Sequence, residues 1–322
     1  MKNLGVAIIA KNEEADIRNC LESVKEADEI VVLDTGSTDN TVAICMEYTK
    51  KIYTDYKWND DFSEARNECL KRCTADYVII IDCDEVLVTP IKQIKKLINE
   101  FWFRKYFGCI FTVEMSLEVF ESPRLFKNVS EIFYINPAHN VPTWRGDADE
   151  LVRRLYRSSF IIDSGYSQAH HQDPDRTMRI LQKELDKNPQ NTRAIYYMGR
   201  EYMNRKMIRE AAELFEGYRD MKLYEPDRWD NELADVLFLL ALCYVDREAW
   251  GDVRWYDAVQ CALWSWSVLP TSTDVADFLM KCFAEMPGSV DEAVRRQDLT
   301  MKFWERVKGE STNQGVLMVR KL

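Results

Sequence analysis

The chain has 322 residues, enough for two domains, and a formal net charge of −11. This charge argues against a general affinity for nucleic acid or anionic membrane, because both require a basic face. A hydrophobic fraction of 46% and a charged fraction of 30% are ordinary for a soluble globular protein.

No segment of the sequence is predicted to span a membrane. The longest apolar stretch, VLFLLALCYV at 236–245, is shorter than the roughly 20 residues that a bilayer requires. The apolar run near the N-terminus is too short for a signal peptide. Nine cysteines are scattered without a CxxC pair, as expected of reduced thiols. These features together predict a cytoplasmic protein.

The first half of the chain alternates predicted strands and helices. Apolar runs predict strands at 5–10, 29–34, 51–56 and 76–82. Amphipathic or capped segments predict helices at 13–27, 41–51 and 61–74. This alternation indicates an α/β domain with a mostly parallel, doubly wound sheet covered on both faces.

The second half is predicted to be all helical. Strand patterns stop at about Asp173, and amphipathic helical periodicity continues to about Lys308. Four residues have the spacing of a tetratricopeptide repeat: Gly199, Tyr202, Ala211 and Phe215. Later copies match less well, and a plain helical bundle is the alternative. The predicted domains are therefore residues 1–172 and 173–322.

The stretch YVIIIDCDEV at 77–86 leads a hydrophobic strand into negative charge. A side-chain period of two would point Asp82 and Asp84 the same way, where they repel unless positive charge lies between them. Carboxylate oxygens suit Mg²⁺ or Mn²⁺, so a divalent cation is one interpretation. The other is that the acids cap the next helix, near Pro90–Lys96.

Polar residues follow three of the predicted strands. Lys11, Asn12 and Glu13 follow the first, Asp34 ends the second ahead of TGSTDNT, and the acidic pair ends the fourth. In open α/β sheets, ligands bind beyond the carboxyl ends of strands. The sequence has neither a GxGxxG after a strand nor a GxxxxGK[ST] motif. Asp34 could accept hydrogen bonds from a nucleotide base or ribose, and Asp82 and Asp84 could hold a cation against a diphosphate. Together these two sites indicate a nucleotide-sugar donor.

Three segments carry a resemblance to a known family: AKNEEADIRNCLESVKEADEIVVLDTGSTDNTVAI, WNDDFSEARNECL and DYVIIIDCDE. They resemble family 2 glycosyltransferases with the GT-A fold. The closer likeness is to a bacterial subgroup that carries C-terminal tetratricopeptide repeats and includes peptide glycosyltransferases of the sublancin type. The likeness is strong over residues 4–90 and continues through SPRLFKN (122–128) and residues 170–201.

The resemblance implies a role for each matching residue on the nucleotide side. The backbone near Ala10, together with Asn12 and Glu13, would line the nucleotide pocket. Asp34 would contact the base, and Arg66 would lie near the nucleotide and pair with its phosphates. The donor would be a nucleotide sugar, with UDP as the expected nucleotide.

The resemblance also implies a metal site. Asp82 and Asp84 would form the DxD motif, with Asp84 as the more direct ligand and with a catalytic part. A later histidine, His170 or His171, would complete the shell, unless this pair is only a loop that leads into a helix. A mixed carboxylate–imidazole shell favours Mn²⁺ over Mg²⁺.

Family 2 enzymes typically invert the anomeric centre, which requires a general base on the acceptor side. In the subgroup an Ile-His-Glu follows RLF, whereas this chain has INPAHNVP, so His139 matches and Asn140 replaces the glutamate. His139 is the tentative base, since an unperturbed imidazole titrates near 6.5. A buried, merely satisfied histidine is the competing interpretation. Four other acids are candidates for the base: Glu114, Glu118, Glu121 and Asp147.

Two other functions compete with a glycosyltransferase. IIIDCDEVLV also fits the first motif of haloacid-dehalogenase-type phosphatases, but that motif opens its domain, whereas two strand–helix units precede it here. A non-catalytic scaffold with a degenerate transferase domain is the stronger alternative. The helical half would bind the acceptor, such as a peptide or glycan, because such repeats form concave surfaces. A hydrophobic groove there could also support a homodimer.

Overall fold

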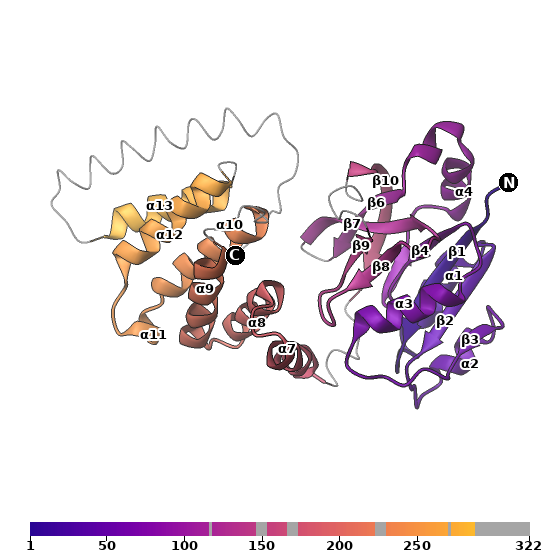
Figure 1. Cartoon of the computed structure of the whole chain (residues 1–322), viewed down its shortest axis with the longest axis horizontal. Coiled ribbons are helices and arrows are strands. Elements are labelled where there is room, and N and C mark those ends of the chain that lie inside the picture. The colour runs from indigo at the N-terminus through magenta and orange to yellow at the C-terminus, as the bar shows by residue number, and fades with distance from the viewer. Residues whose placement is uncertain (116–117, 146–152, 166–172, 223–229, 270–271, 287–322) are drawn as a thin grey trace. The chain divides into compact units, whose positions relative to one another are not determined.

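The computed structural model describes residues 1–115, 118–145, 153–165, 173–222, 230–269 and 272–286 (Figure 1). Two compact units divide within helix α7 (Arg176–Lys187), between Ile180 and Leu181. The sequence places this boundary at 172/173, at the edge of a segment outside the described residues. That exact domain boundary stays a prediction.

The first unit alternates strands and helices as the sequence predicts. Its strands are β1 (Leu4–Ala10), β2 (Glu29–Asp34), β3 (Lys51–Tyr53), β4 (Tyr77–Ile80), β5 (Glu85–Leu87), β6 (Gly108–Met115), β7 (Glu118–Lys127), β8 (Ile132–Ile135), β9 (Val141–Trp144) and β10 (Leu155–Ser164). Its helices, apart from the first turn of α7, are α1 (Ile17–Val24), α2 (Thr41–Cys45), α3 (Phe62–Arg72), α4 (Ile91–Asn99) and the 3₁₀ helix η1 (Phe101–Lys105).

Eight strands form one sheet in the order β3-β2-β1-β4-β7-β6-β10-β5, and β8 pairs with β9 in a separate hairpin. Only β7 and β5 run antiparallel to their neighbours, so six of the eight strands share one direction. The predicted mostly parallel sheet is confirmed. The carboxyl ends of β1, β2 and β4 therefore meet at one rim, where ligands bind in such sheets.

The sheet curls around the turn that joins β4 to β5. In a flat sheet of this order the two strands would lie four spacings apart, about 19 Å. Instead, the Glu85 amide donates to the Asp82 carbonyl at 3.1 Å. The acidic residues Asp82 and Asp84 thus occupy a tight turn after β4, which ends at Ile80. The predicted strand at 76–82 is too long, and the period-two argument does not apply to this pair.

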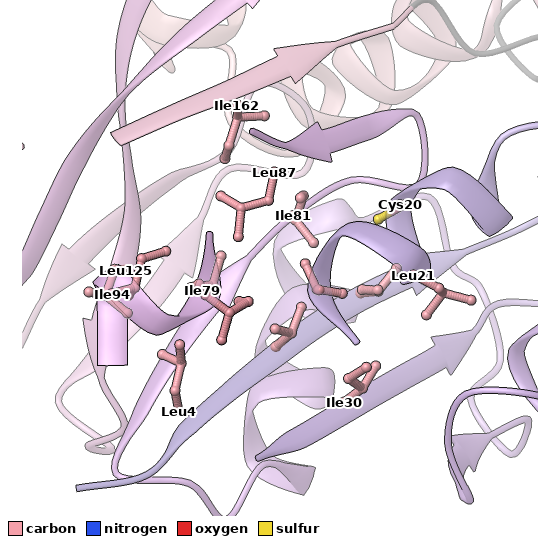
Figure 2. Close-up of a cluster of buried hydrophobic side chains, with 14 of the residues drawn as sticks. Leu4, Cys20, Leu21, Ile30, Ile79, Ile81, Leu87, Ile94, Leu125 and Ile162 are labelled. Carbon is pink, nitrogen blue, oxygen red and sulfur yellow. The ribbon is translucent and has the colours of Figure 1, made fainter. Parts of the chain in front are cut away.

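Both faces of the sheet are covered. On one face, apolar side chains of α1 and α4 pack against the strands. Figure 2 shows the helix residues Cys20, Leu21 and Ile94 in this cluster, together with strand residues such as Ile79 and Leu125. The helix α3 and the β8–β9 hairpin cover the other face. Each fully buried leucine or isoleucine contributes about 1.5–3 kcal/mol. This core holds the strand ends in fixed positions.

The carboxylate of Glu29 ties the start of β2 to the chain entering β4. It accepts hydrogen bonds from the Thr74 amide (2.8 Å), the Thr74 hydroxyl (2.8 Å) and the Ala75 amide (2.8 Å), and it pairs with Lys51. Burial alone would raise the pKa of Glu29, but Lys51 and the Thr74 and Ala75 donors hold it below its usual value of 4.5.

Glu29→Gln is expected to lower the free energy of unfolding by about 1.5–3 kcal/mol at pH 7, because it removes a charged acceptor from buried donors. Because the folded-state pKa is depressed, this contribution is present above pH 4.5 and is lost as the pH falls through the folded value. Urea denaturation from pH 7 to pH 3 measures both effects. Glu47→Gln, at an exposed ion pair with Arg18, is the control. Equal losses in the two variants would contradict this prediction.

The second unit is helical, as predicted. After the rest of α7 it contains α8 (Thr192–Asn204), α9 (Ile208–Lys222), α10 (Asp230–Tyr244), α11 (Arg247–Trp250), α12 (Trp255–Val268) and α13 (Thr273–Glu285). Gly199 of α8 lies against the Phe215 ring of α9, where an added Cβ would come within 2.5 Å of a ring carbon. That close approach explains the small residue, while the tetratricopeptide type of the repeat stays a prediction. Within the described residues, no helix combines the length and apolar character that crossing a membrane requires.

Candidate functional site

The loops after β1 and β2 are joined by hydrogen bonds beside the rim of the sheet. The Asn12 amide donates to the Ser37 hydroxyl at 2.9 Å, and the Asn12 side-chain oxygen accepts from the Thr38 amide at 2.7 Å. The Glu13 amide donates to the Thr41 hydroxyl at 2.7 Å. At the end of β1, the Ala10 carbonyl accepts from the Thr35 amide at 2.9 Å. Ala10, Asn12 and Glu13 thus border the loop that begins at Asp34.

Asp34 has one oxygen committed to the protein and one without a partner. Its Oδ2 accepts from the amides of Gly36 and Ser37, both at 3.0 Å, and Gly36 has a φ of +111°, which favours glycine. The buried Oδ1 has no hydrogen-bond partner among the described residues. A buried acceptor without a partner is costly unless a ligand or water supplies the donor. Asp34 is therefore suited to bind a hydrogen-bond donor of a ligand.

The acidic turn is anchored at several atoms. The Asp82 amide donates to Glu85 Oε2 at 2.9 Å, and the Asp84 carbonyl accepts from the Gly165 amide at 2.8 Å. The buried Cys83 thiol donates to the Ile9 carbonyl at 3.2 Å. These contacts connect the turn to β1, to β5 and to the residue that follows β10. Its two aspartates, Asp82 and Asp84, are half-buried.

Two arginines neutralise acids of this turn. Arg66 of α3 donates to Asp82 Oδ1 at 2.7 Å, and Arg124 of β7 donates to Glu85 Oε1 at 2.6 Å. Arg124 also lies 3.9 Å from Asp82 Oδ2. Burial, followed by the charge of Asp82, raises the pKa of Glu85 to about 7, while Arg124 opposes the rise. The ring centroid of the buried Tyr134 lies 5.6 Å from the Arg66 guanidinium.

This pairing changes the electrostatic argument for a metal. Repulsion between Asp82 and Asp84 does not require a cation, because Arg66 already compensates Asp82. The two carboxylates are nevertheless hard oxygen donors, and Mg²⁺ is usually held by one or two carboxylates plus substrate phosphates. The residues present therefore fit a divalent cation. No cluster of three or more potential metal ligands forms among the described residues, and His170 and His171 lie outside them.

The first turn of α7 brings a further arginine to this side of the unit. The Arg176 guanidinium lies 5.1 Å from the Phe62 ring centroid. Burial lowers the pKa of Arg176, while the carboxylates of Asp173 and Glu13 oppose that shift. Arg176 is therefore close enough to Glu13, at the edge of the β1 loop, for their charges to interact.

The tentative base, His139, lies in the loop between β8 and β9. Its side chain is exposed and its φ is +48°, so His139 is not the buried histidine of the competing interpretation. The Phe62 amide donates to the Pro137 carbonyl at 2.9 Å, and Asn67 exchanges hydrogen bonds with the Tyr134 backbone. The hairpin that carries His139 is thereby fixed to α3, the helix that carries Arg66.

Of the four alternative bases, two side chains are described by the structure and two fall outside it. Glu114 is exposed near the carboxyl end of β6, which runs in the same direction as β4. Glu121 is exposed and pairs with Arg157. The side chain of Glu118 and all of Asp147 lie outside the described residues.

Three residues near the site had no individual role in the sequence-based prediction: Glu85, Arg124 and Arg176. Arg124 lies within SPRLFKN, a segment of the family likeness, and Glu85 directly follows the DxD motif. No sequence signal indicates that Glu85 and Arg124 form a buried ion pair, because 38 residues lie between them and β5 does not pair with β7.

Comparisons with known proteins identify a family and relatives that this chain resembles. The model of the glycosyl transferase family 2 matches residues 5–150. The chain is 26% identical over 262 residues to the SPbeta prophage-derived glycosyltransferase SunS of Bacillus subtilis, covering 77% of this chain and 60% of that protein. It is 42% identical over 90 residues to a TPR repeat-containing protein of Synechococcus elongatus, covering 27% and 22% of the two chains. The chain thus spans less than two thirds of the length of each of these relatives.

Solved structures also show likeness. Glucosyl-3-phosphoglycerate synthase from Mycobacterium tuberculosis, in complex with Mn²⁺ and UDP-glucose, is 15% identical with a TM-score of 0.41, over 57% of this chain and 78% of that one. TarS of S. aureus is 13% identical with a TM-score of 0.39, over 84% and 53%. The family match, together with the mostly parallel sheet, confirms the predicted GT-A fold. The chain therefore carries a glycosyl transferase family 2 domain over residues 5–150.

Proposed function

We propose that the protein is a metal-dependent, inverting glycosyltransferase that moves a sugar from a UDP-sugar donor to a peptide or glycan acceptor. The observation that carries the proposal is the buried, unpartnered Oδ1 of Asp34 at the same rim of the sheet as the acidic turn. A nucleotide-sugar donor requires an acceptor for its base and a site for its diphosphate. The family match of residues 5–150 supports the same reaction class.

The hydrogen-bonding of Asp34 favours uracil over guanine. Oδ2 is already occupied by two backbone amides, which leaves Oδ1 as the acceptor for a ligand. Uracil offers one donor, N3–H, between two carbonyl groups, whereas guanine offers two adjacent donors that suit both oxygens of a carboxylate. One available oxygen matches one N–H.

The carboxylate of Asp84, with that of Asp82 beside it, would hold Mn²⁺ or Mg²⁺. When bound, the cation supplies positive charge for the diphosphate as the bond to the sugar breaks. Arg66 pairs with Asp82 and holds its carboxylate in place, so in this proposal it serves the turn and does not bind the phosphates itself. Arg176, close to Glu13, adds a second positive charge on the nucleotide side.

In the proposed reaction, an acceptor hydroxyl attacks the anomeric carbon on the face opposite to the leaving group. The new C–O bond forms as the bond to the diphosphate breaks, and UDP departs with the electron pair. His139 takes the hydroxyl proton as general base. The helical unit from Leu181 onward would bind the acceptor. A cytoplasmic location and a homodimer remain predictions.

Calorimetric titration of UDP, with and without Mn²⁺, tests the donor half of this proposal. Asp34→Asn should weaken UDP binding by roughly 10- to 150-fold, because one hydrogen bond to a charged group contributes about 1.5–3 kcal/mol. The asparagine oxygen can still accept from the Gly36 and Ser37 amides, so the turn should stay intact.

The matched control is Asp28→Asn, which alters the acid that pairs with Lys95 away from the rim. This variant should bind UDP like the wild type. If the wild type binds neither UDP nor GDP, the transferase proposal fails and a non-catalytic scaffold becomes the better interpretation. If it binds GDP but not UDP, the reaction class stands and the base is guanine.

A further inference from the structure

The carboxylate of Glu85 connects the acidic turn to a strand in the middle of the sheet. Its Oε1 accepts from Arg124 at 2.6 Å and its Oε2 accepts from the Asp82 amide at 2.9 Å. Glu85 is 3% exposed and Arg124 is 9% exposed, so water scarcely reaches this pair. A single buried ion pair thus joins β7 to the backbone of the turn at the residue that begins the DxD motif.

We propose that Arg124 and Glu85 are positioning residues that lock the Asp82–Asp84 turn and thereby fix the carboxylate of Asp84. In this proposal neither residue contacts the donor or the metal; both act through the turn. The consequence for donor binding rests on the proposed function, whereas the lock on the turn does not.

Charge and hydrogen bonding explain why this pair would govern the turn. Arg66 and Arg124 bring two positive charges to Asp82 and Glu85, so these two acids of the turn are held by ion pairs from α3 and β7. Removing one partner from a buried ion pair leaves an uncompensated charge and is strongly destabilising. Without Arg124, Glu85 can keep its charge only by moving toward solvent. Because Glu85 also holds the Asp82 amide, such movement would open the turn.

The turn contains a built-in reporter of its own opening. Cys83, between the two aspartates, is 5% exposed and its thiol donates to the Ile9 carbonyl at 3.2 Å. Cys20 contacts the same turn, since its thiol donates to the Asp82 carbonyl at 3.3 Å. A thiol reagent can reach these sulfurs only when the turn or the whole domain opens. Cys69, in the core on the other face of the sheet, and Cys243, in the helical unit, are also buried and report opening elsewhere.

The experiment is alkylation of the native protein, with each cysteine quantified by peptide mass spectrometry. In Arg124→Met, Cys83 should react at least tenfold faster than in the wild type, while Cys69 and Cys243 keep their rates. Arg124→Lys keeps the charge but loses the forked contact, so it should accelerate Cys83 by a smaller factor. Arg72→Met is the matched control, because Arg72 is similarly buried and paired with Asp55 and Glu68, yet does not contact the turn. This control should leave Cys83 unchanged.

Two labelling results would overturn the lock: an unchanged rate at Cys83, or an equal acceleration of all the cysteines, which indicates global unfolding. If Arg124→Met fails to fold, Arg124→Lys still tests the lock, since it keeps the charge and loses only the forked geometry of the guanidinium.

The donor link is tested by UDP binding in the presence of Mn²⁺. The affinity for UDP should fall by about 10- to 100-fold in Arg124→Met, the range seen when outer-shell partners of a metal site are removed. In Arg72→Met the affinity should equal that of the wild type. Unchanged affinity despite faster labelling of Cys83 would overturn the donor link. Absence of UDP binding by the wild type would instead refute the proposed function, and the labelling of Cys83 would then decide the lock by itself.

Discussion

Asp84→Asn is expected to abolish the Mn²⁺ dependence of UDP binding and to slow sugar transfer on the order of 10³-fold. The substitution keeps the shape of the side chain and replaces an anionic donor with a neutral amide. A bound cation stabilises the negative charge that develops in the transition state by several kcal/mol. Each 1.36 kcal/mol of this stabilisation changes the rate by a factor of ten. Calorimetry with and without Mn²⁺ measures the binding, and release of UDP from a UDP-sugar measures the rate.

Asp82→Asn separates the two acids of the motif. Asp82 is half-buried and accepts a hydrogen bond from the buried Arg66, so this substitution should lower the free energy of unfolding by about 1.5–3 kcal/mol, the usual contribution of a hydrogen bond to a charged group. Asp84→Asn leaves the Arg66–Asp82 pair in place and should keep the stability that this pair contributes. Metal-dependent UDP binding that survives in Asp84→Asn would contradict the assignment of Asp84 as the principal ligand.

His139→Gln is expected to lower kcat by about 10²- to 10⁴-fold, the usual contribution of a general base. UDP binding should be unaffected, because His139 lies on the β8–β9 hairpin and not in the loops after β1 or β2. Its side chain is exposed, so the substitution should also leave stability nearly unchanged. Initial rates of transfer to the acceptor and the KM for the donor provide the measurement.

Glu114→Gln is the matched comparison for the base. Glu114 is also exposed, near the carboxyl end of β6. If Glu114→Gln loses the rate while His139→Gln keeps it, the general base belongs to β6 and the match of His139 to the family motif is coincidental. Loss of UDP binding in His139→Gln would place this residue in the donor pocket instead.

Much of the α/β unit could be predicted because its signals are local. Runs such as GVAIIA and EIVVLD are apolar and bounded by polar turns, and they form β1 and β2. The position of Asp34 at a strand end follows from the same pattern, and so does its place on the rim. The glycine after it, Gly36, adopts the positive φ that a tight turn implies. Residues 4–90 also carry the family likeness, so pattern and resemblance agreed there.

The pairing of charges could not be predicted, because it depends on contacts between residues distant in sequence. The sequence predicts that Arg66 pairs with the phosphates of the nucleotide. In the structure it donates a hydrogen bond to Asp82, which lies 16 residues later in the chain. The apolar run into Asp82 predicts a longer strand than the structure has, because the hydrogen bond from the Asp82 amide to Glu85 begins a turn there. No periodicity reveals that β5, four residues after β4, pairs with β10.

The partnership of β5 with β10 has a consequence for synthesis on the ribosome. Glu85 pairs with Ser164 in an antiparallel ladder, and Gly165 holds the Asp84 carbonyl. About 80 residues of chain must emerge after the acidic motif before its supports exist. At translation rates of about 5–20 residues per second, that delay is roughly 4–16 seconds. The nascent domain would acquire the loops around Asp34 first and a finished catalytic centre only after its last strand is made.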